Sequence, residues 1–406
     1  MAISTASIPV PGRSRLPVGA LLLLSLAVFL TVTAETLPAG LLPEMATGLG
    51  ATPAQIGLLI SVWALTVIVT SLPLARATAR IDRRLVVAAS LAVFAAANVA
   101  TALAPVFGFA MGTRVVAAVA HGVFWAVVIV YASALLAPAQ LGRGLAIVTA
   151  GGTAATVAGL PVATLLAQTT TWRIAFAAVG AISLVLAFVV WRRMPRVAPP
   201  RGEAAPGGPA PLRRDPSLPA LAAFGAAAVL IAVAQFAAFT YIRPYLEVSA
   251  SIGPEWAAPL LFAYGMAGMV GVAVAGVLAD RHPRAAIIGV LVTFAAAFAA
   301  LTVGAGSVAV VVAGLAAWGF AIGAIFPLLQ STLMRVASDR TRTLASAGMV
   351  VLFNVGIAAG PWLGGLLGGE REPTVNTAVS AVAMVAAAVL GVVGALLARD
   401  RLAVRR

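Results

Sequence analysis

The chain has 406 residues, of which 62% are hydrophobic and 9% are charged. A soluble protein has about 25% charged residues, so this composition excludes an ordinary globular protein and indicates a polytopic membrane protein. The formal net charge of +14 is compatible with nucleic-acid binding, but the positions of the arginines argue against that partner. The chain has no cysteine, which excludes disulfides, thiol catalysis and cysteine-based metal sites.

Twelve apolar stretches follow one another along the chain, and each is long enough to cross a hydrocarbon core of about 30 Å as a helix. Backbone amides in lipid need partners within their own segment, so each stretch is predicted to be helical. The expected spans are 18–41, 55–75, 85–104, 107–135, 144–167, 173–192, 219–241, 257–279, 285–303, 308–333, 344–368 and 374–397. We therefore predict an all-α membrane protein with twelve transmembrane helices.

The basic residues mark one side of these spans. All 26 are arginines, and all but four lie at the chain ends, in the central linker or on every second connection; the exceptions are Arg114, Arg173, Arg243 and Arg371. Basic residues gather on the cytoplasmic side of membrane proteins. We therefore expect a multi-pass protein of the cell (inner) membrane with cytoplasmic termini and linker, whose arginines contact membrane lipids and no nucleic acid.

A linker divides the chain into two halves. Residues 194–216 are rich in proline, glycine and arginine and lack apolar periodicity, which is typical of a flexible segment. Six spans precede it in 1–193 and six follow it in 217–406. The halves repeat weakly, because the second span of each ends at a short basic connection. Two pseudo-symmetric six-helix halves are the architecture of transporters that rock around a central site.

The connection after the eighth span has a recognisable pattern. It reads Gly-Val-Leu-Ala-Asp-Arg-His-Pro-Arg from residue 276 to residue 284, and the residues that carry the motif are Gly276, Asp280, Arg281 and Arg284. A degraded copy in the first half keeps Arg80, Arg83 and Arg84. This pattern resembles the inner-loop signature of the major facilitator superfamily, with Pro283 in place of the second glycine. These charges either set topology or form an inner latch by charge pairing.

The eleventh span adds a second motif, made of Gly356, Gly360, Pro361, Gly364 and Gly365. It matches the antiporter signature that the superfamily usually has in its fifth span, where this chain keeps a partial form with Gly159 and Pro161. Small residues let helix backbones approach closely, and proline removes a backbone donor. We expect these residues to pack helices and, in the functional interpretation, to seal or bend the structure during alternating access.

Three further segments narrow the resemblance. They are Glu35–Glu44, Arg114 with the segment His121–Phe124, and Thr171–Arg173 with Phe176. Together they are similar to the twelve-span drug:proton antiporter family, near its arabinose/sugar efflux permease-like branch. The resemblance implies export of a small molecule, a drug-like compound or metabolite, in exchange for protons. The alternatives are a sugar-specific exporter, a proton symporter and, remotely, a non-transporting membrane sensor.

No enzyme is expected, because neither a catalytic cluster nor an appended domain is visible. ATP-driven transport by this chain alone is excluded, because a P-loop is impossible without lysine. No metal site is expected either, because no second buried histidine or carboxylate lies at ligand spacing. We therefore expect no cofactor, and a protein that works as a monomer with protons and a small-molecule substrate as its partners.

Three ionisable residues within the spans are the candidates for proton coupling. Glu35 is a carboxylate in the first span, where it is paired, protonated or facing water; alternatively the span ends near Thr33 and leaves Glu35 wetted. Arg114 and His121 lie seven residues apart, on one face of the fourth span. Imidazole titrates near physiological pH. A proton relay with Glu35, a structural Glu35–Arg114 pair and a neutral, hydrogen-bonded His121 all remain open.

A transport pocket needs aromatic walls and a few hydrogen-bonding groups. Polar and aromatic residues within or near the ends of the spans are therefore candidates for a substrate cavity, although such aromatics also serve as packing or interface residues. The candidates are Trp63, Phe124, Trp125, Tyr131, Gln235, Tyr241, Tyr264, Trp318, Gln330 and Asn354.

Overall fold

The computed structural model describes residues 16–137, 140–197, 215–338 and 341–398. Within these ranges the regular structure is helical and contains no strand, and twelve helices are long and apolar enough to cross a membrane. The predicted all-α, twelve-span fold is confirmed. Most of the predicted linker 194–216 lies outside the described residues.

Each predicted span corresponds to one helix or to a run of helices. The first half consists of α1 (Val18–Gly40), α2 (Leu42–Leu49), α3 (Pro53–Ala77), α4 (Arg83–Ala102), α5 (Phe107–Ala134), α6 (Leu141–Ala154), η2 (Ala155–Gly159), α7 (Leu160–Thr169) and α8 (Trp172–Arg193). The second half consists of α9 (Leu218–Thr240), α10 (Ile242–Pro244), η4 (Tyr245–Ser249), η5 (Pro254–Trp256), α11 (Ala257–Arg281), α12 (Pro283–Val303), α13 (Val308–Val336), α14 (Arg342–Leu367) and α15 (Pro373–Leu397).

Local sequence explains several helix boundaries. α3 begins with Pro53 after a reciprocal cap, in which the Thr52 hydroxyl accepts from the Gln55 amide N–H and the Gln55 side chain accepts from the Thr52 N–H. The Asp82 carboxylate accepts from the Arg84 N–H at the start of α4. α1 continues to Gly40, so the first span does not end near Thr33 and Glu35 lies within the helix.

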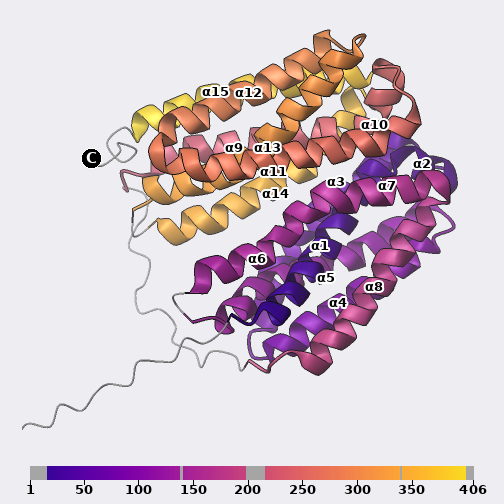
Figure 1. Ribbon diagram of the computed structural model, residues 1–406, viewed down its shortest axis with the longest axis vertical. Coiled ribbons are helices and arrows are strands. Elements are labelled where there is room, and N and C mark those ends of the chain that lie inside the picture. Colours follow the sequence, from indigo (N-terminus) through magenta and orange to yellow (C-terminus); the bar gives the residue numbers. More distant parts are fainter. Residues whose placement is uncertain (1–15, 138–139, 198–214, 339–340, 399–406) are drawn as a thin grey trace, which may run out of the picture.

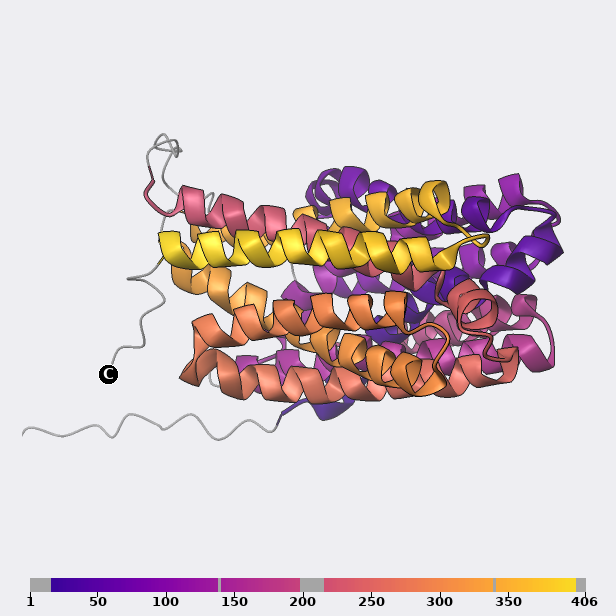
Figure 2. The same ribbon diagram turned by 90° about the horizontal axis from the view of Figure 1, so that it is seen from above.

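The two halves lie side by side, with their long helices running roughly parallel (Figures 1 and 2). We call the end at which α8 finishes and α9 begins the linker end. The other end carries the connections 41–52 and 241–256, where α2 and α10 lie next to each other (Figure 1). The two halves lie close together at this second end and further apart at the linker end (Figure 1). We therefore call the second end the sealed end.

Buried side chains explain why the halves meet at the sealed end. The main core of the second half also contains four first-half residues: Ala39, Ile60, Ala64 and Leu160. A first-half cluster around Trp63 contains Tyr241 from the second half. The cluster around Tyr131, near the linker end, contains first-half residues alone. Apolar burial, the main stabilising contribution to such contacts, is therefore shared between the halves near the sealed end.

The fifth span is irregular in the middle. η2 is a single π-helical turn between α6 and α7, and such turns are frequent at functional sites. Gly159 at its end faces the side chain of Thr33 on α1, with no room for a Cβ. On another side, a Cβ on Gly265 of α11 would lie 2.6 Å from the Val157 Cα. The π-turn therefore packs closely against α1 and against the other half.

Candidate functional site

The three residues predicted to couple protons lie together in the interior of the first half. Glu35 comes from the last turns of α1, and Arg114 and His121 come from one face of α5. Trp63 of α3 contacts both Arg114 and His121. The Trp63 ring centroid is 4.0 Å from the Arg114 guanidinium carbon and 5.1 Å from the His121 ring centroid. Arg114 and Trp63 are fully buried. The structure thus brings together two ionisable groups and a fixed cation from two helices.

The Glu35 carboxylate faces His121. Its Oε2 lies 3.8 Å from His121 Nε2, and the two side chains are 16% and 7% exposed. His121 also contacts Trp125, with ring centroids 6.1 Å apart. Carboxylate and imidazole are both able to accept and release a proton, so the pair has the chemistry of a proton carrier in a largely apolar setting.

Arg114 contacts backbone oxygens of α1. Its Nη1 donates to the Ala34 carbonyl oxygen at 2.9 Å, and its Nη2 donates to the Glu35 carbonyl oxygen at 3.2 Å. The Glu35 carboxylate contacts His121, as described above. Arg114 is therefore placed next to Glu35, as the sequence suggests, but its hydrogen bonds go to the main chain of α1.

A second polar cluster lies in the other half. Gln235 of α9 donates to the Tyr264 hydroxyl at 2.9 Å and accepts from the Trp318 indole N–H at 2.6 Å. All three residues are buried, and Phe239 and Phe298 pack against the Trp318 ring at centroid distances of 6.2 and 4.8 Å. These predicted cavity residues form one hydrogen-bonded aromatic cluster.

The other predicted cavity residues are dispersed. Phe124 and Tyr131 belong to the cluster near the linker end, where the Tyr131 hydroxyl donates to the Pro195 carbonyl oxygen at 2.6 Å. The Tyr241 hydroxyl donates to the Pro361 carbonyl oxygen at 3.0 Å. Asn354 donates to a carbonyl of its own helix, and Gln330 is half-buried on α13. These contacts account for Phe124, Tyr131, Tyr241 and Asn354 by packing or hydrogen bonding.

The glycines of the eleventh span pack α14 against α9. Cβ atoms on Gly356, Gly360 and Gly364 would each lie within 3.0 Å of α9 atoms, and one on Gly365 would lie 2.6 Å from the Tyr241 hydroxyl. Gly365 also faces Ala54 of α3, in the other half. In the fifth span, Gly159 is the last residue of η2 and Pro161 is the second residue of α7. Both motifs therefore lie where helices approach closely.

The inner-loop motif residues lie at the linker end. Arg80 and Arg281 are exposed, Arg84 and Arg284 are half-buried, and Gly276 has open space around it. Arg83 is buried, and its N–H donates to the Val197 carbonyl oxygen at 3.3 Å. The Asp280 side chain lies outside the described part of the chain, so a latch through that carboxylate stays a prediction.

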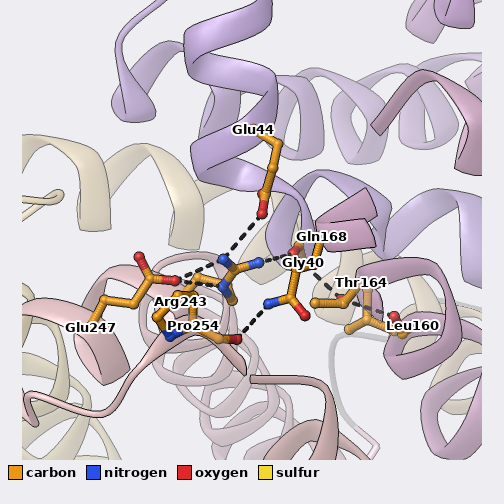
Figure 3. Close-up of polar contacts among 8 residues, drawn as sticks. All are labelled: Gly40, Glu44, Leu160, Thr164, Gln168, Arg243, Glu247 and Pro254. Carbon is orange, nitrogen blue, oxygen red and sulfur yellow. Dashed lines mark hydrogen bonds and ion pairs between the residues drawn. The ribbon is translucent and has the colours of Figure 1, made fainter. Parts of the chain in front are cut away.

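A buried arginine joins the two halves at the sealed end (Figure 3). Arg243 of α10 is 2% exposed, and its guanidinium donates to the Gly40 carbonyl oxygen and to Glu44 Oε1 of the first half, each at 3.1 Å. It also pairs with Glu247, one turn along its own segment, at 2.7 Å. Gln168 of α7 donates to the Pro254 carbonyl oxygen nearby, at 2.5 Å (Figure 3).

Comparison with known proteins places this architecture in a family. A family model described as Major Facilitator Superfamily matches residues 24–361 and 257–405. This chain belongs to the Major Facilitator Superfamily. The superfamily named from the sequence motifs is therefore confirmed, and the protein is a multi-pass membrane transporter by family.

Two curated relatives of this transporter are efflux pumps. Two chloramphenicol efflux pumps, from two strains of Mycobacterium tuberculosis, are each 33% identical to it over 351 and 352 residues, which are 85% of this chain and 84% of theirs. They agree with the resemblance to drug:proton antiporters.

Solved transporters share the fold. The nucleoside transporter NupG has a TM-score of 0.74 at 15% identity, covering 93% of this chain and 99% of its own. The peptide transporter POT has a TM-score of 0.77 at 13% identity, with coverages of 96% and 97%. A bacterial homologue of the lysosomal transporter Spinster, inward-facing and occupied, has a TM-score of 0.70 at 16% identity, with coverages of 96% and 97%.

Sequence reasoning missed Arg243 as a site residue of this transporter, because it was counted among the loop arginines. A signal was nevertheless present. Arg243 follows directly after an apolar span, between Tyr241-Ile242 and Pro244-Tyr245, with Glu247 at the spacing of an ion pair on one helical turn. An arginine among large apolar neighbours points to burial with a carboxylate partner.

Proposed function

We propose that this transporter exports a small drug-like molecule across the cytoplasmic membrane in exchange for protons. The observation that carries the proposal is the Glu35–His121 contact inside the first half, beside the Arg114 guanidinium. Ionisable side chains inside a membrane protein are costly and are kept for pathways or relays. The similarity to chloramphenicol efflux pumps supports export as the direction.

The Glu35–His121 pair supplies the proton-carrying groups. A proton taken up by the pair removes the negative charge of Glu35 or adds a positive charge on His121, next to the fixed charge of Arg114. Each protonation state therefore has a different electrostatic energy in this apolar setting. Such a difference is what couples proton uptake on one side of the membrane to a change in the preferred conformation.

The substrate is expected to be an amphipathic molecule such as chloramphenicol. The first half offers Trp63 and Trp125 next to His121, and the second half offers the Gln235–Tyr264–Trp318 cluster. Aromatic walls with a few hydrogen-bonding groups favour a ligand that is largely apolar and carries polar substituents. Substrate and protons use the same interior, on opposite phases of one cycle.

Alternating access follows from motion of the halves. Arg243 and the shared core hold the sealed end closed. We propose that the linker end is cytoplasmic, so that this conformation receives substrate from the cell interior. Release of substrate on the other side then requires the sealed end to open and the linker end to close. Because one chain contains both halves, the transporter is expected to act as a monomer.

The test is transport in proteoliposomes that contain the purified protein and an imposed pH gradient. We expect chloramphenicol to move against its own gradient in the wild type and in a Glu255→Gln control, because Glu255 is exposed at the sealed end. Glu35→Gln should insert normally and lose this uphill transport. Uphill transport by Glu35→Gln at the wild-type rate contradicts the proposal; proton-driven uptake indicates a symporter, and movement of a sugar alone indicates the sugar exporter.

A further inference from the structure

α1 contains a proline where its helix would otherwise form a backbone hydrogen bond. The helix runs without interruption to Gly40 although Pro38 lies in its last turn. In an α-helix each N–H donates to the carbonyl four residues earlier, and proline has no N–H. The carbonyl of Ala34 is therefore left without its helical donor. Ala34 is fully buried, and a buried polar group without a partner is costly.

Arg114 supplies the missing donor. Its Nη1 donates to that same Ala34 carbonyl oxygen at 2.9 Å, and its Nη2 donates to the next carbonyl, that of Glu35, at 3.2 Å. The guanidinium lies over the Trp63 ring, with its carbon 4.0 Å from the centroid, and this contact fixes its plane. A cation at the carbonyl end of a helix is also favoured by the helix dipole.

This arrangement decides where the Glu35 carboxylate points. Both terminal nitrogens of Arg114 bind the main chain, and its Nε has no hydrogen-bond partner. The carboxylate contacts His121, 3.8 Å away. Arg114 thus holds the α1 backbone at the residue that carries the carboxylate, while the carboxylate itself faces the imidazole.

We propose that Arg114 is a positioning residue: it replaces the hydrogen bond that Pro38 removes from α1, and so it orients Glu35 toward His121. Pro38 and Arg114 are then one functional unit, in which the proline creates a backbone acceptor and the arginine occupies it. The inference rests on the proposed function only in taking Glu35 as the proton carrier.

Two substitutions of Arg114 separate hydrogen-bond donation from charge. Arg114→Gln is neutral but keeps an N–H donor, whereas Arg114→Met is neutral and cannot donate. If Arg114 acts by donation, Arg114→Met loses most of the proton-driven export and melts at a lower temperature, and Arg114→Gln retains more of both. Equal loss in the two variants overturns the proposal, because charge would then be the property that matters.

The decisive test restores the backbone donor. Pro38→Ala gives residue 38 an N–H, which can donate to the Ala34 carbonyl. The double variant Pro38→Ala/Arg114→Met should therefore recover melting temperature and part of the export lost in Arg114→Met. The control is Pro73→Ala in the same background, because Pro73 also lies inside a helix, α3, far along the chain from this carbonyl. Equal effects of the two proline substitutions, or no recovery at all, overturn the proposal.

The melting measurement needs no transport, and this keeps the two proposals apart. Suppose that Pro38→Ala restores the stability of Arg114→Met and that Glu35→Gln exports uphill normally. The proposal about the Pro38–Arg114 pair then stands, and Glu35 is contradicted as the proton carrier. Loss of export in Glu35→Gln without recovery by Pro38→Ala supports Glu35 as the proton carrier and contradicts the Pro38–Arg114 pair. If Arg114→Met alone is not recovered from membranes, the yields of the two double variants decide, because the proposal expects Pro38→Ala, and not Pro73→Ala, to restore the yield.

Discussion

The Arg243 guanidinium of α10 donates to the Gly40 carbonyl oxygen at 3.1 Å, and so joins the second half of the transporter to the last residue of α1. The Thr164 hydroxyl of α7 approaches the same oxygen at 3.4 Å (Figure 3). Gly40 lies five residues beyond Glu35. A contact that must break when the sealed end opens is therefore connected to the candidate proton carrier by little more than one helical turn.

Removal of Arg243 should loosen the sealed end. Arg243→Gln leaves Glu44 and Glu247 near each other without their shared cation, and a hydrogen bond to a charged group contributes about 1.5–3 kcal/mol. A cysteine introduced at Ala39, which is fully buried in the core that the halves share, should then react at least ~10-fold faster with a thiol reagent, since ten-fold corresponds to about 1.4 kcal/mol.

The native chain has no cysteine, so this labelling reports on the introduced residue alone. Glu44→Gln should accelerate labelling, because Glu44 belongs to the other half, and Glu247→Gln should do so less, because it lies in the same segment as Arg243. Unchanged labelling in Arg243→Gln would show that apolar contacts alone hold the end closed.

A methyl group on Gly265 should separate the halves. Its Cβ would lie 2.6 Å from the Val157 Cα and 2.8 Å from the Thr156 carbonyl oxygen, both backbone atoms of η2 in the other half. We expect Gly265→Ala to reduce transport and to accelerate Ala39→Cys labelling. Gly289→Ala on α12 of the same half is the control, since nothing lies within 4 Å of its Cβ position. Wild-type behaviour of both variants would contradict the close packing of α11 on η2.

Gln235→Leu should destabilise the second half. The substitution leaves the Tyr264 hydroxyl and the Trp318 indole N–H without their partner, and each orphaned buried group costs about 1–3 kcal/mol. The measurement is the melting temperature in detergent, together with the concentration of substrate at half-maximal transport. Asn354→Leu should have a smaller effect, because that amide donates within its own helix. A larger effect of Asn354→Leu would mean that the hydrogen bonds of Gln235 contribute less to stability than the Asn354 amide does.

The sidedness of the transporter is open to direct labelling. Ile81, at the linker end, and Val303, at the sealed end, are 40% and 90% exposed. In intact cells a membrane-impermeant thiol reagent should label Val303→Cys and should leave Ile81→Cys unlabelled until the cells are broken. This result follows from the arginines gathered at the linker end. The reverse pattern would invert the topology and with it the direction assigned to transport.

The fold was predictable from the sequence because a membrane imposes one length and one secondary structure on every span. The neighbourhood of Glu35, Arg114 and His121 was also predictable, since the last two share a helix face and all three are ionisable groups that avoid lipid. The Gln235–Tyr264–Trp318 cluster was not, because its members come from three helices and no periodicity links them.

Two features depended on packing that no local pattern encodes. Arg243 reads as a loop residue, and its burial comes from the contact with Gly40 and Glu44 in the other half. The sequence suggests Tyr131 as a cavity residue, yet its hydroxyl donates to the carbonyl oxygen of Pro195, just beyond the end of α8. In both cases the partner is far along the chain, so that the tertiary arrangement alone brings the groups together.

The π-turn η2 lets the fifth span contain one residue more than a regular α-helix would place between the same packing partners. A π-turn closes with i→i+5 hydrogen bonds, so the extra residue is absorbed in the turn, and α6 and α7 keep their facing. Removal of one residue from 155–159 is therefore expected to give a regular α-helix and to leave Gln168 near the Pro254 carbonyl oxygen that it now binds. Removal of one residue from α7 before Gln168 would instead turn everything after it by about 100°, so deletions there are expected to be far less tolerated than a deletion in the turn.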